Sequence, residues 1–440
     1  MIMAMIGPET EMKDSGVEYV GAIPKDWDLV RLRAYFGERK NKNKDGKETN
    51  LLSLSYGRII RKNIDKTDGL LPASFNTYNI VEKNDIIIRP TDLQNDKRSL
   101  RTGLVTEHGI ITSAYIDLMP TGNVDSRFVH YLLHSYDILK VFYNMGSGVR
   151  QGLNYSEFSK LKVPMPLLTE QQTIADYLDE TCSKIDEIIA EAKASIDEYK
   201  ELKQSVIFDG ISLGTRSCCE YKKTTLEGIK KIPVAWEYRK LKFLIKYIES
   251  GVSVNAGNEP ATELEYGVLK TSCVSKMVFI PSENKSVNKD EYDRVKCPVC
   301  GNTIIVSRMN TPDLVGACAY IEKNINNIFL PDRLWQVHFN DDANVKYVYY
   351  CLISPYIRNY YSSLSTGTSS SMQNISQGQF ANAIITYPSL EEQKEIVEFL
   401  DKRTAEIDSL ISEKESLIND LEAYKKSLIY EVVTGKRRVV

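Results

Sequence analysis

Two phrases that each occur twice limit the fold of this chain more than any other feature. The segment TEQQTIADYLD, which ends at Asp179, returns 222 residues later as EEQKEIVEFLD, which ends at Asp401. An earlier segment, IPKDWDLVRLRAYF from Ile23, returns 209 residues later as IPVAWEYRKLKFLI from Ile232. Shorter matches between them have offsets of 218 and 219, so the order of the matching segments is kept. Such a repeat predicts two similarly folded halves, the second with longer loops.

The first part of each half has the pattern of a globular domain. Between about residues 16 and 166, and again between about 225 and 388, short β-branched and aromatic runs alternate with Gly, Asn, Asp and Pro. One helix-like stretch follows near the end of each part, over residues 126–143 and 345–361. Each half is therefore predicted to begin with a mixed α/β domain.

The second part of each half has a seven-residue pattern instead. One row of mostly apolar residues recurs every seven positions, and a second row is expected three positions further along. Such a stripe predicts a long helix of roughly 36 residues, about 54 Å in length, with one apolar seam. The residues predicted to form the seam are Leu178, Ile185, Ile188, Tyr199, Leu202, Leu400, Ile407, Leu410, Leu421 and Leu428.

The ends of both helices are also predicted from the sequence. A polar residue followed three positions later by Gln or Glu marks a helix start, and glycine marks a helix stop. The expected starts are Thr169 with Gln172 and Ser389 with Glu392. The expected stops are Gly210, Gly214 and Gly435.

A helix with one apolar seam needs a partner that covers the seam. The simplest partner is the other copy, and the long domain between the copies allows them to lie antiparallel. Packing of each helix on its own domain is the alternative. The predicted fold class is α+β, with two mixed α/β domains related by an internal repeat and separated by two long antiparallel coiled-coil helices. The predicted boundaries are 1–166 and 215–388 for the domains, and 167–214 and 389–440 for the helical spacers.

The charge of the chain is unevenly distributed, although the net charge is only −3. Residues 167–214 and 389–435 together carry −13, which leaves +10 on the rest of the chain. Basic domains beside acidic helices favour a polyanion as the ligand of the domains, although ordinary solvated surface can have the same composition.

The expected compartment follows from apolar runs and cysteines. No apolar run approaches the ~18 residues that span a bilayer, and the first residues lack the order of a signal peptide. We therefore expect a cytoplasmic protein whose eight cysteines are reduced. Cys297 and Cys300 form a C-x-x-C pair, but a closed zinc site needs four ligands and the nearby Cys273 and Cys318 are each isolated. An ordinary turn is the favoured interpretation, and no metal site is predicted.

In this order, the segments resemble the specificity subunit of Type I restriction-modification enzymes. The resemblance runs from MKDSGVEYVGAIPKDWDLVRL at Met12, through PLLTEQQTIADYLDETCSKIDEIIAEAKASIDEYKELKQSVI at Pro166 and IPVAWEYRKLKFL at Ile232, to PSLEEQKEIVEFLDKRTAEIDSLI at Pro388. It covers essentially the whole chain from Met12. Two helical signatures together with two I-P-x-x-W segments are far more specific than a single short motif.

The resemblance implies a subunit that recognises DNA and has no catalysis of its own. Two target-recognition domains would each read one half of a split, asymmetric site in double-stranded DNA. Two copies of a methyltransferase subunit would dock on this chain, and restriction-translocase subunits would be recruited through them. S-adenosylmethionine, ATP and Mg would be bound by those partners, and no cofactor is expected here. In agreement, we recognise no ATP loop, S-adenosylmethionine fingerprint, methylation motif or nuclease cluster in the sequence.

Candidate DNA contacts in the first domain lie in three polar segments. The loop RPTDLQNDKR has side chains that can pair with guanine, adenine and phosphate, although a solvated turn has the same composition. In YGRIIRK basic residues alternate with apolar ones, and GSGVRQ is either a flexible phosphate-binding loop or a linker. The residues predicted to contact DNA are Arg58, Lys62, Arg89, Thr91, Gln94, Asn95, Lys97, Arg98, Ser147, Arg150 and Gln151.

Candidate contacts in the second domain are polar residues at corresponding or similar positions. The segment SSSMQN, for example, stands where the first half has GSGVRQ. The residues predicted to contact DNA are Lys270, Ser272, Lys276, Arg308, Asn310, Ser370, Gln373 and Asn374.

The sequence alone leaves two other functions open. A coiled-coil adaptor would use the helices and both domains for protein binding, but the basic domains disfavour this. A recognition subunit of another restriction-modification class would keep DNA binding but pair with a different or fused enzyme. The bases recognised and the spacing between the half-sites are not encoded in any pattern that we can interpret.

Overall fold

The computed structural model describes residues 11–64, 74–91, 93, 100–143, 145, 152–215, 220–226, 228–364, 366–369 and 372–439. The chain forms two compact units. Unit 1 comprises residues 1–192 and 416–440, and unit 2 comprises residues 193–415. Both units therefore contain a part of each long helix.

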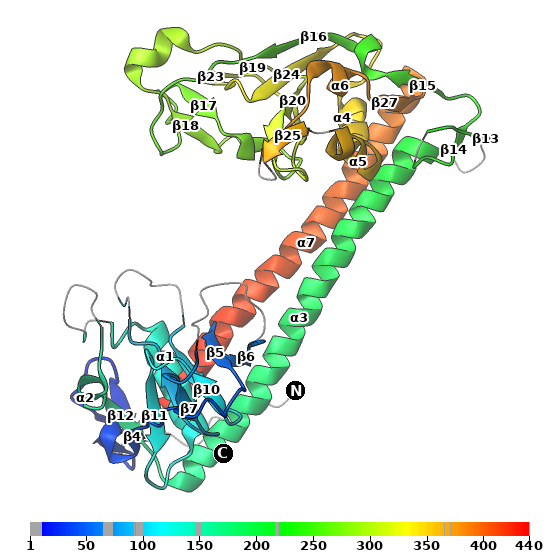
Figure 1. The fold of residues 1–440 in the computed structure, drawn as a ribbon. Coiled ribbons are helices and arrows are strands. Elements are labelled where there is room, and N and C mark those ends of the chain that lie inside the picture. Colours follow the sequence, from blue (N-terminus) through cyan, green and yellow to red (C-terminus); the bar gives the residue numbers. More distant parts are fainter. Residues whose placement is uncertain are drawn as a thin grey trace. The chain divides into compact units, whose positions relative to one another are not determined.

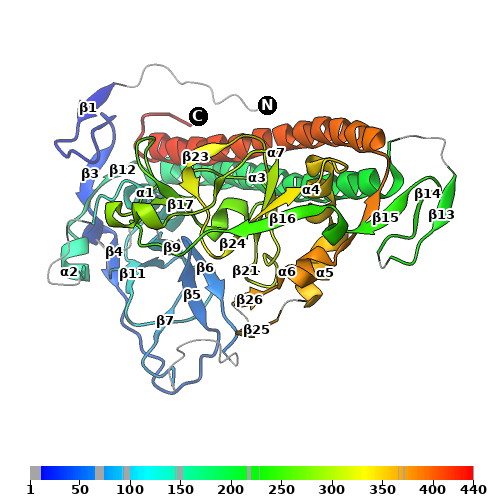
Figure 2. The same ribbon diagram turned by 90° about the horizontal axis from the view of Figure 1, so that it is seen from above.

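The centre of unit 1 is a four-stranded antiparallel sheet in the order β4-β11-β8-β9. Its strands are β4 (Phe36–Glu38), β11 (Ile116–Pro120), β8 (Ile86–Ile88) and β9 (Thr102–Leu104). The three isoleucines of β8 are fully buried, as a short apolar run bounded by turn residues predicts. Helix α1 (Ser126–Ile138) lies between this sheet and the long helix α3 (Leu168–Leu213) (Figure 2).

Shorter elements surround the sheet of unit 1. The remaining strands form antiparallel pairs: β1 (Met12–Asp14) with β2 (Ala22–Pro24), β3 (Asp28–Arg31) with β12 (Lys162–Met165), β5 (Leu52–Ser55) with β6 (Arg58–Arg61), and β7 (Asn79–Val81) with β10 (Gly109–Ile111). The short helices are η1 (Leu32–Ala34) and α2 (Tyr155–Phe158).

Unit 2 has the same sheet at its centre, in the order β16-β24-β20-β22 (Figure 1). Its strands are β16 (Ile245–Ser250), β24 (Leu334–Phe339), β20 (Thr303–Ser307) and β22 (Cys318–Ile321). A second sheet of this unit has the order β18-β17-β23-β19 and the strands β18 (Asn284–Ser286), β17 (Gly267–Leu269), β23 (Ile325–Phe329) and β19 (Pro298–Val299).

The remaining elements of unit 2 mostly match those of unit 1. The strand pairs are β13 (Tyr221–Lys223) with β14 (Lys231–Pro233) and β15 (Glu237–Lys240) with β27 (Ile384–Tyr387). A small sheet has the order β21-β26-β25, with strands β21 (Met309–Asn310), β26 (Met372–Asn374) and β25 (Thr366–Ser369). The short helices are η2 (Leu241–Phe243), η3 (Thr271–Val274), η4 (Lys289–Arg294), α4 (Val345–Ile353), α5 (Pro355–Leu364) and α6 (Gln377–Ala381).

The predicted repeat is confirmed by this comparison. Both central sheets have the same strand order and only antiparallel neighbours, and the first strand of each follows a 3-10 turn. The predicted fold class, two mixed α/β domains combined with two long helices, is confirmed as well.

The helix-like stretch of the second half is broken, which the sequence analysis missed. Helix α4 ends at Ile353 and α5 begins at Pro355. Ser354 between them is extended, with ψ 148°. A residue before proline is disfavoured in helical geometry, and proline fits the first turn of a new helix.

The two long helices pair with each other in antiparallel orientation within each unit. Helix α3 has 46 residues and α7 (Leu390–Val433) has 44, so both are longer than predicted. In unit 1, Asp186 of α3 bonds Lys425 of α7 at 2.7 Å, and Glu170 lies 3.4 Å from Arg438 beyond α7. In unit 2, Lys203 bonds Asp408 at 2.7 Å, while Gly210 packs against Leu400. No described helix is apolar enough over a sufficient length to cross a membrane.

The seam follows one predicted row and departs from the other. Members of the first row on both helices are buried or half-buried, namely Leu178, Ile185, Tyr199, Leu400, Ile407, Leu421 and Leu428. Ile188, Leu202 and Leu410 are 45%, 47% and 40% exposed, so their assignment to the seam is wrong. The second row lies four residues after the first, not three, and includes Cys182, Ile189, Ile196, Thr404 and Ile418. A second row three residues after the first and one four residues after it both fit a heptad, because the spacing between apolar positions alternates between three and four.

The helix ends also differ partly from the prediction. Ser389 and Glu392 form the expected start of α7: the Glu392 N–H donates to Ser389 Oγ at 3.3 Å, and the Glu392 carboxylate accepts from the Ser389 N–H. Helix α3 begins at Leu168, one residue before the expected cap Thr169. Gly214 and Gly435 have φ of +76° and +71° and end the helices as predicted. Gly210 is wrong as a stop, because α3 continues past it and a Cβ there would lie 2.9 Å from Leu400.

Candidate nucleic-acid interface

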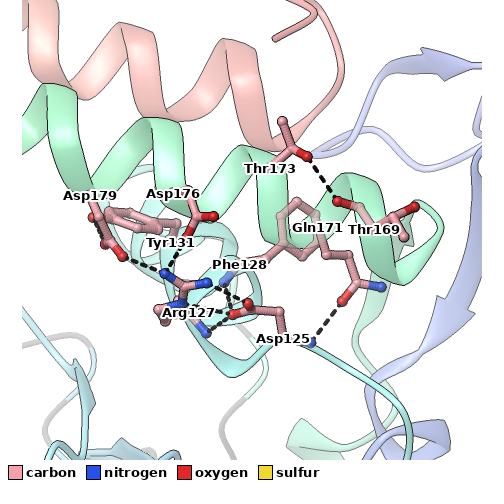
Figure 3. Close-up of polar contacts among 9 residues, drawn as sticks. All are labelled: Asp125, Arg127, Phe128, Tyr131, Thr169, Gln171, Thr173, Asp176 and Asp179. Atoms are coloured by element: carbon pink, nitrogen blue, oxygen red, sulfur yellow. Dashed lines mark hydrogen bonds and ion pairs between the residues drawn. The ribbon is translucent and has the colours of Figure 1, made fainter. Parts of the chain in front are cut away.

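Polar contacts attach the domain of unit 1 to α3 (Figure 3). Gln171 accepts from the backbone N–H of Asp125 at 3.0 Å and donates to the Pro166 carbonyl at 2.9 Å. Asp179 accepts from the Tyr131 hydroxyl at 2.7 Å and from Arg127 at 2.9 Å. Asp125 also caps α1 by accepting from two backbone N–H groups, so the same residues fix the helix start and the domain.

Unit 2 repeats these contacts almost atom for atom. Gln393 accepts from the Asn344 N–H at 2.9 Å and donates to the Pro388 carbonyl at 3.0 Å. Asp401 accepts from the Tyr350 hydroxyl at 2.6 Å and from Lys346 at 2.7 Å. We call this set, in either unit, the clamp.

A buried tryptophan completes the clamp of each unit. The indole N–H of Trp27 donates to Glu170 at 3.2 Å, and that of Trp236 donates to Glu392 at 3.4 Å. The glycine that ends the other long helix packs on the same ring: a Cβ at Gly435 would lie 3.3 Å from Trp27, and one at Gly214 would lie 3.0 Å from Trp236. Each tryptophan thus contacts the start of one helix and the end of the other.

The clamp explains the repeated phrases of the sequence. Glu, Gln and Asp occupy the same places in TEQQTIADYLD and EEQKEIVEFLD because they bond the same partners in both units. The helix pattern alone predicts no role for these residues. The identity of these polar residues in both copies of the helix was the available signal.

In unit 1, the segment after β8 carries two of the predicted DNA contacts. The Arg89 N–H donates to the Arg101 carbonyl at 2.8 Å, and the exposed Thr91 follows two residues later. The Leu153 N–H donates to the Pro90 carbonyl at 3.0 Å, which joins this segment to a residue just beyond the predicted contacts at 147, 150 and 151. The predicted contacts that lie outside the described residues are Gln94, Asn95, Lys97, Arg98, Ser147, Arg150 and Gln151.

The hairpin β5–β6 carries two more predicted contacts. Arg58 forms an ion pair with Asp186 of α3 at 3.0 Å, so binding a phosphate would compete with this carboxylate. Lys62 at the end of the hairpin is exposed. The turn between the strands is Tyr56-Gly57, with φ of 47° and 77°, and the Tyr56 side chain is 89% exposed.

In unit 2 the structure brings four predicted contacts together. Asn310 on β21 pairs with Gln373 on β26, and Asn374 pairs with the neighbouring Met309. The Ile375 N–H donates to the Arg308 carbonyl at 3.1 Å, which matches the bond between Leu153 and Pro90 in unit 1. Ser370, which was predicted for the same surface, lies outside the described residues.

Two polar atoms in or next to this small sheet have no hydrogen-bond partner among the described residues. They are the Arg308 Nε, a donor, and the Asn374 Oδ1, an acceptor, and both are buried. A buried polar atom without a partner is costly and is often retained at binding sites. Ile375, which follows Asn374, donates its N–H to the Arg308 carbonyl, so the two side chains come from neighbouring segments.

The remaining predicted contacts of unit 2 lie on another element. Lys270 precedes η3 and lies 3.9 Å from the Glu283 carboxylate, and the Ser272 hydroxyl donates to the same carboxylate at 2.6 Å. Lys276 is exposed. The neighbouring negative charge of Glu283 makes Lys270 and Ser272 weaker phosphate ligands than their sequence alone suggests.

Each central sheet carries a polar cluster whose chemistry differs between the units. In unit 1, Arg39 bonds Asp85 through both carboxylate oxygens at 2.7 and 3.1 Å, and Asp117 lies beside them. Burial, and then the neighbouring Asp85, raise the pKa of Asp117 well above its usual range. Asp117 therefore retains its proton around neutral pH, and as an acid it can donate to Asp85.

In unit 2 the corresponding cross-strand pair is Glu249 with Gln336. Gln336 donates to Glu249 at 2.9 Å and accepts from the Cys300 N–H at 2.8 Å, so it holds the C-x-x-C turn against the sheet. Cys297 has a positive φ of 61°, in keeping with a turn. Among the described residues, no group of three or more His, Cys, Asp or Glu side chains is arranged to hold a metal ion.

The family model of the Type I restriction modification DNA specificity domain matches residues 24–198 and 233–420. The MjaVIII specificity subunit of Methanocaldococcus jannaschii is 25% identical over 95% of this chain and 94% of that protein. The EcoEI specificity subunit of Escherichia coli is 26% identical over 42% of this chain, a match that spans 32% of that protein.

Two solved structures share the fold. A chain from a study of complex assembly and conformational transition of a type I R-M system has a TM-score of 0.66 and 14% identity, over 93% of this chain and 98% of that chain. The HsdS subunit from Thermoanaerobacter tengcongensis has a TM-score of 0.50 and 15% identity, over 94% of this chain and 98% of that one.

Because the family model covers most of the chain, this protein belongs to the family of Type I restriction-modification DNA specificity domains. The predicted role as a DNA-recognition subunit of such an enzyme is confirmed.

Proposed function

We propose that units 1 and 2 each read one half of a split, asymmetric site in double-stranded DNA. The observation that carries this proposal is a shared framework with different side chains. In unit 1 the segment after β8 is bonded to a later segment through Pro90 and Leu153. In unit 2 the segment after β20 is bonded in the same way through Arg308 and Ile375. A common backbone frame that presents different polar side chains suits two half-sites of different sequence.

The side chains proposed to face DNA have the required chemistry. Arginine can pair with both acceptors of guanine, and asparagine or glutamine can pair with adenine. In unit 2 these are Arg308, Asn310, Gln373 and Asn374. The Arg308 Nε and the Asn374 Oδ1, which have no hydrogen-bond partner within the part of the chain that the structure describes, would supply one donor and one acceptor. In unit 1 they are Arg89 and Thr91, together with the predicted residues of the two loops that lie outside the described range.

The proposed assembly follows the family. This chain would select the site, with domains at 1–166 and 215–388 and spacers at 167–214 and 389–440. Two methyltransferase subunits would bind it and methylate adenine, and restriction-translocase subunits would join them in the cytoplasm. Those partners would carry S-adenosylmethionine, ATP and Mg.

The test is DNA binding by the chain co-expressed with its partner subunits, at a site identified by mapping methylated adenines in the host genome. Replacing Arg308 or Asn374 by Ala should weaken binding to the cognate site roughly tenfold to a hundredfold, because each would remove a base contact worth about 1–3 kcal/mol. Replacing Arg294 by Ala is the matched control, since this exposed arginine of unit 2 lies in η4, away from the small sheet, and pairs with Glu291 of the same helix.

Loss of a phosphate contact should affect DNA binding differently from loss of a base contact. Replacing Lys62 by Ala should weaken binding to all duplexes about equally and reduce the salt slope by about 1. Unchanged cognate affinity of both the Arg308 and Asn374 variants would remove them from the reading surface. If the complex bound no duplex in a salt-dependent manner, the adaptor function would replace DNA recognition.

A further inference from the structure

One arginine in unit 1 ties together the ends of a proposed reading loop. Arg101 is fully buried at the end of the loop that begins after β8. Its carbonyl accepts from the Arg89 N–H at 2.8 Å, and its Nη1 donates to the Thr91 carbonyl. The two strand ends on either side of the loop are thus held to each other by a charge-assisted bond.

The same arginine also holds the second proposed loop of unit 1. Its Nε donates to the Tyr143 hydroxyl at 3.0 Å, and its guanidinium lies 5.1 Å from the Tyr143 ring centroid. The Tyr143 hydroxyl in turn donates to Asp137 at 3.0 Å, and the backbone N–H of Arg101 donates to the same carboxylate. Tyr143 precedes the second proposed loop in the sequence, and Leu153, which follows it, is bonded to Pro90. Both loops therefore start from one bonded cluster.

In unit 2, an arginine from a different element bonds the corresponding loop. The position of Arg101 is occupied by Ala317, whose carbonyl accepts from the Ser307 N–H at 2.8 Å. Here Arg358 of α5 donates to the carbonyl of Asp313 in the loop after β21, also at 2.8 Å. Gly316 ends this loop with φ +72°, and a Cβ there would lie 2.8 Å from the Tyr361 ring of α5.

We propose that Arg101 and Arg358 are positioning residues that set the base preference of the half-site read by their own unit. This inference rests on the proposed function. Discrimination between bases depends on side chains being held to within about half an ångström. Arg101 cannot contact DNA itself because it is fully buried, so it acts through the backbone positions of Arg89 and Thr91.

The experiment compares Arg101→Met and Arg358→Met with the unchanged chain, each co-expressed with the partner subunits. Binding is measured to the methylation-mapped site and to a panel with one base pair changed at each position of either half-site. In the unchanged complex each base-pair change should weaken binding roughly tenfold to a hundredfold. In a variant, base-pair changes in one half-site only should weaken binding by roughly threefold. Arg101→Met and Arg358→Met should affect opposite half-sites.

Two further variants separate positioning from stability. Arg39→Met removes another arginine of unit 1, which bonds Asp85 on the central sheet, and should retain base preference even where it lowers thermal stability. Arg101→Lys keeps the charge and can restore one of the lost bonds, so it should recover part of the preference. A role in stability alone would make Arg39→Met and Arg101→Met equivalent.

The possible outcomes are distinct. If Arg101→Met is folded and keeps its full preference at both half-sites, the inference is wrong, while the Arg308 and Asn374 variants still test the proposed function. Equal loss at both half-sites would also overturn it, because a positioning role is confined to one unit. If the unchanged complex shows no half-site preference, the proposed function itself fails.

Discussion

The two units use nearly the same contacts to hold the long helices and different contacts to hold their loops. Both clamps consist of a buried Trp, a Gln that bonds two backbone groups, and an Asp that binds a Tyr and a cation. By contrast, the loops after β8 and β21 are held by Arg101 in one unit and Arg358 in the other. Attachment of a domain to a long helix therefore requires the same side chains in both units. A loop, by contrast, can be supported by an arginine from any element that reaches its backbone.

The largest expected difference between the two units is the pH dependence of stability that comes from the polar cluster in the central sheet. Because the folded-state pKa of Asp117 is raised, to about 8, the folded unit 1 holds a proton that the unfolded chain loses near pH 4. Its contribution to stability is present at low pH and is lost as pH rises toward about 8, by roughly 1 kcal/mol for each pH unit.

Asp117→Asn should remove this pH dependence. Unit 2 has an amide, Gln336, at the same place and serves as the internal reference. Opening free energies from hydrogen exchange of β8 and β11, against β20 and β24, would report each unit separately. Identical pH profiles of the two units in the unchanged protein would contradict the assignment.

The clamp tryptophans should have the next largest effect. Trp27→Ala and Trp236→Ala should each lower the unfolding free energy of their own unit by about 3–5 kcal/mol, because a buried ring that packs on two helices is lost. Phe243→Ala, which removes a ring that is 62% exposed, should cost less than about 0.5 kcal/mol. Hydrogen exchange or urea unfolding would measure both, and a markedly smaller loss in one unit would show that the clamps are not equivalent.

The clamp glutamines should have a smaller and matched effect. Gln171→Ala and Gln393→Ala each leave a buried N–H and a carbonyl without a partner, at a cost of about 1–3 kcal/mol. Gln172→Ala is the control, since this neighbouring glutamine is exposed. Chemical denaturation monitored by tryptophan fluorescence would measure the change. Costs for Gln171 and Gln393 that differ by more than about 1 kcal/mol would break the equivalence of the two units.

Some parts of the architecture could be predicted because they depend on local sequence periodicity. The repeat, the two helices and the Ser389 start were all visible as spacings between residues. The seam was predicted only in part, because apolar residues stand at both Ile188 and Ile189 and at both Leu410 and Ile411. In such places the helix phase depends on the partner helix, which no local pattern contains.

The candidate interface was less predictable for a related reason. Arg308 and Asn374 are far apart in the sequence, and only the pairing of β21 with β26 brings their segments together. Arg58 was chosen for its charge, but its position beside Asp186 depends on how the hairpin meets α3. The role of Arg101 was also hidden, because its sequence neighbours are those of an ordinary polar loop.

The duplication of an α/β domain and the presence of two long helices follow from the order of residues in the chain, because periodicity and repetition are properties of the sequence. Three features depend on folding: which row of each helix is buried, what the repeated Glu, Gln and Asp bond, and which arginine supports each loop. These depend on contacts between distant segments, and the energy of a hydrogen bond or a buried ring exists only once both partners are in place.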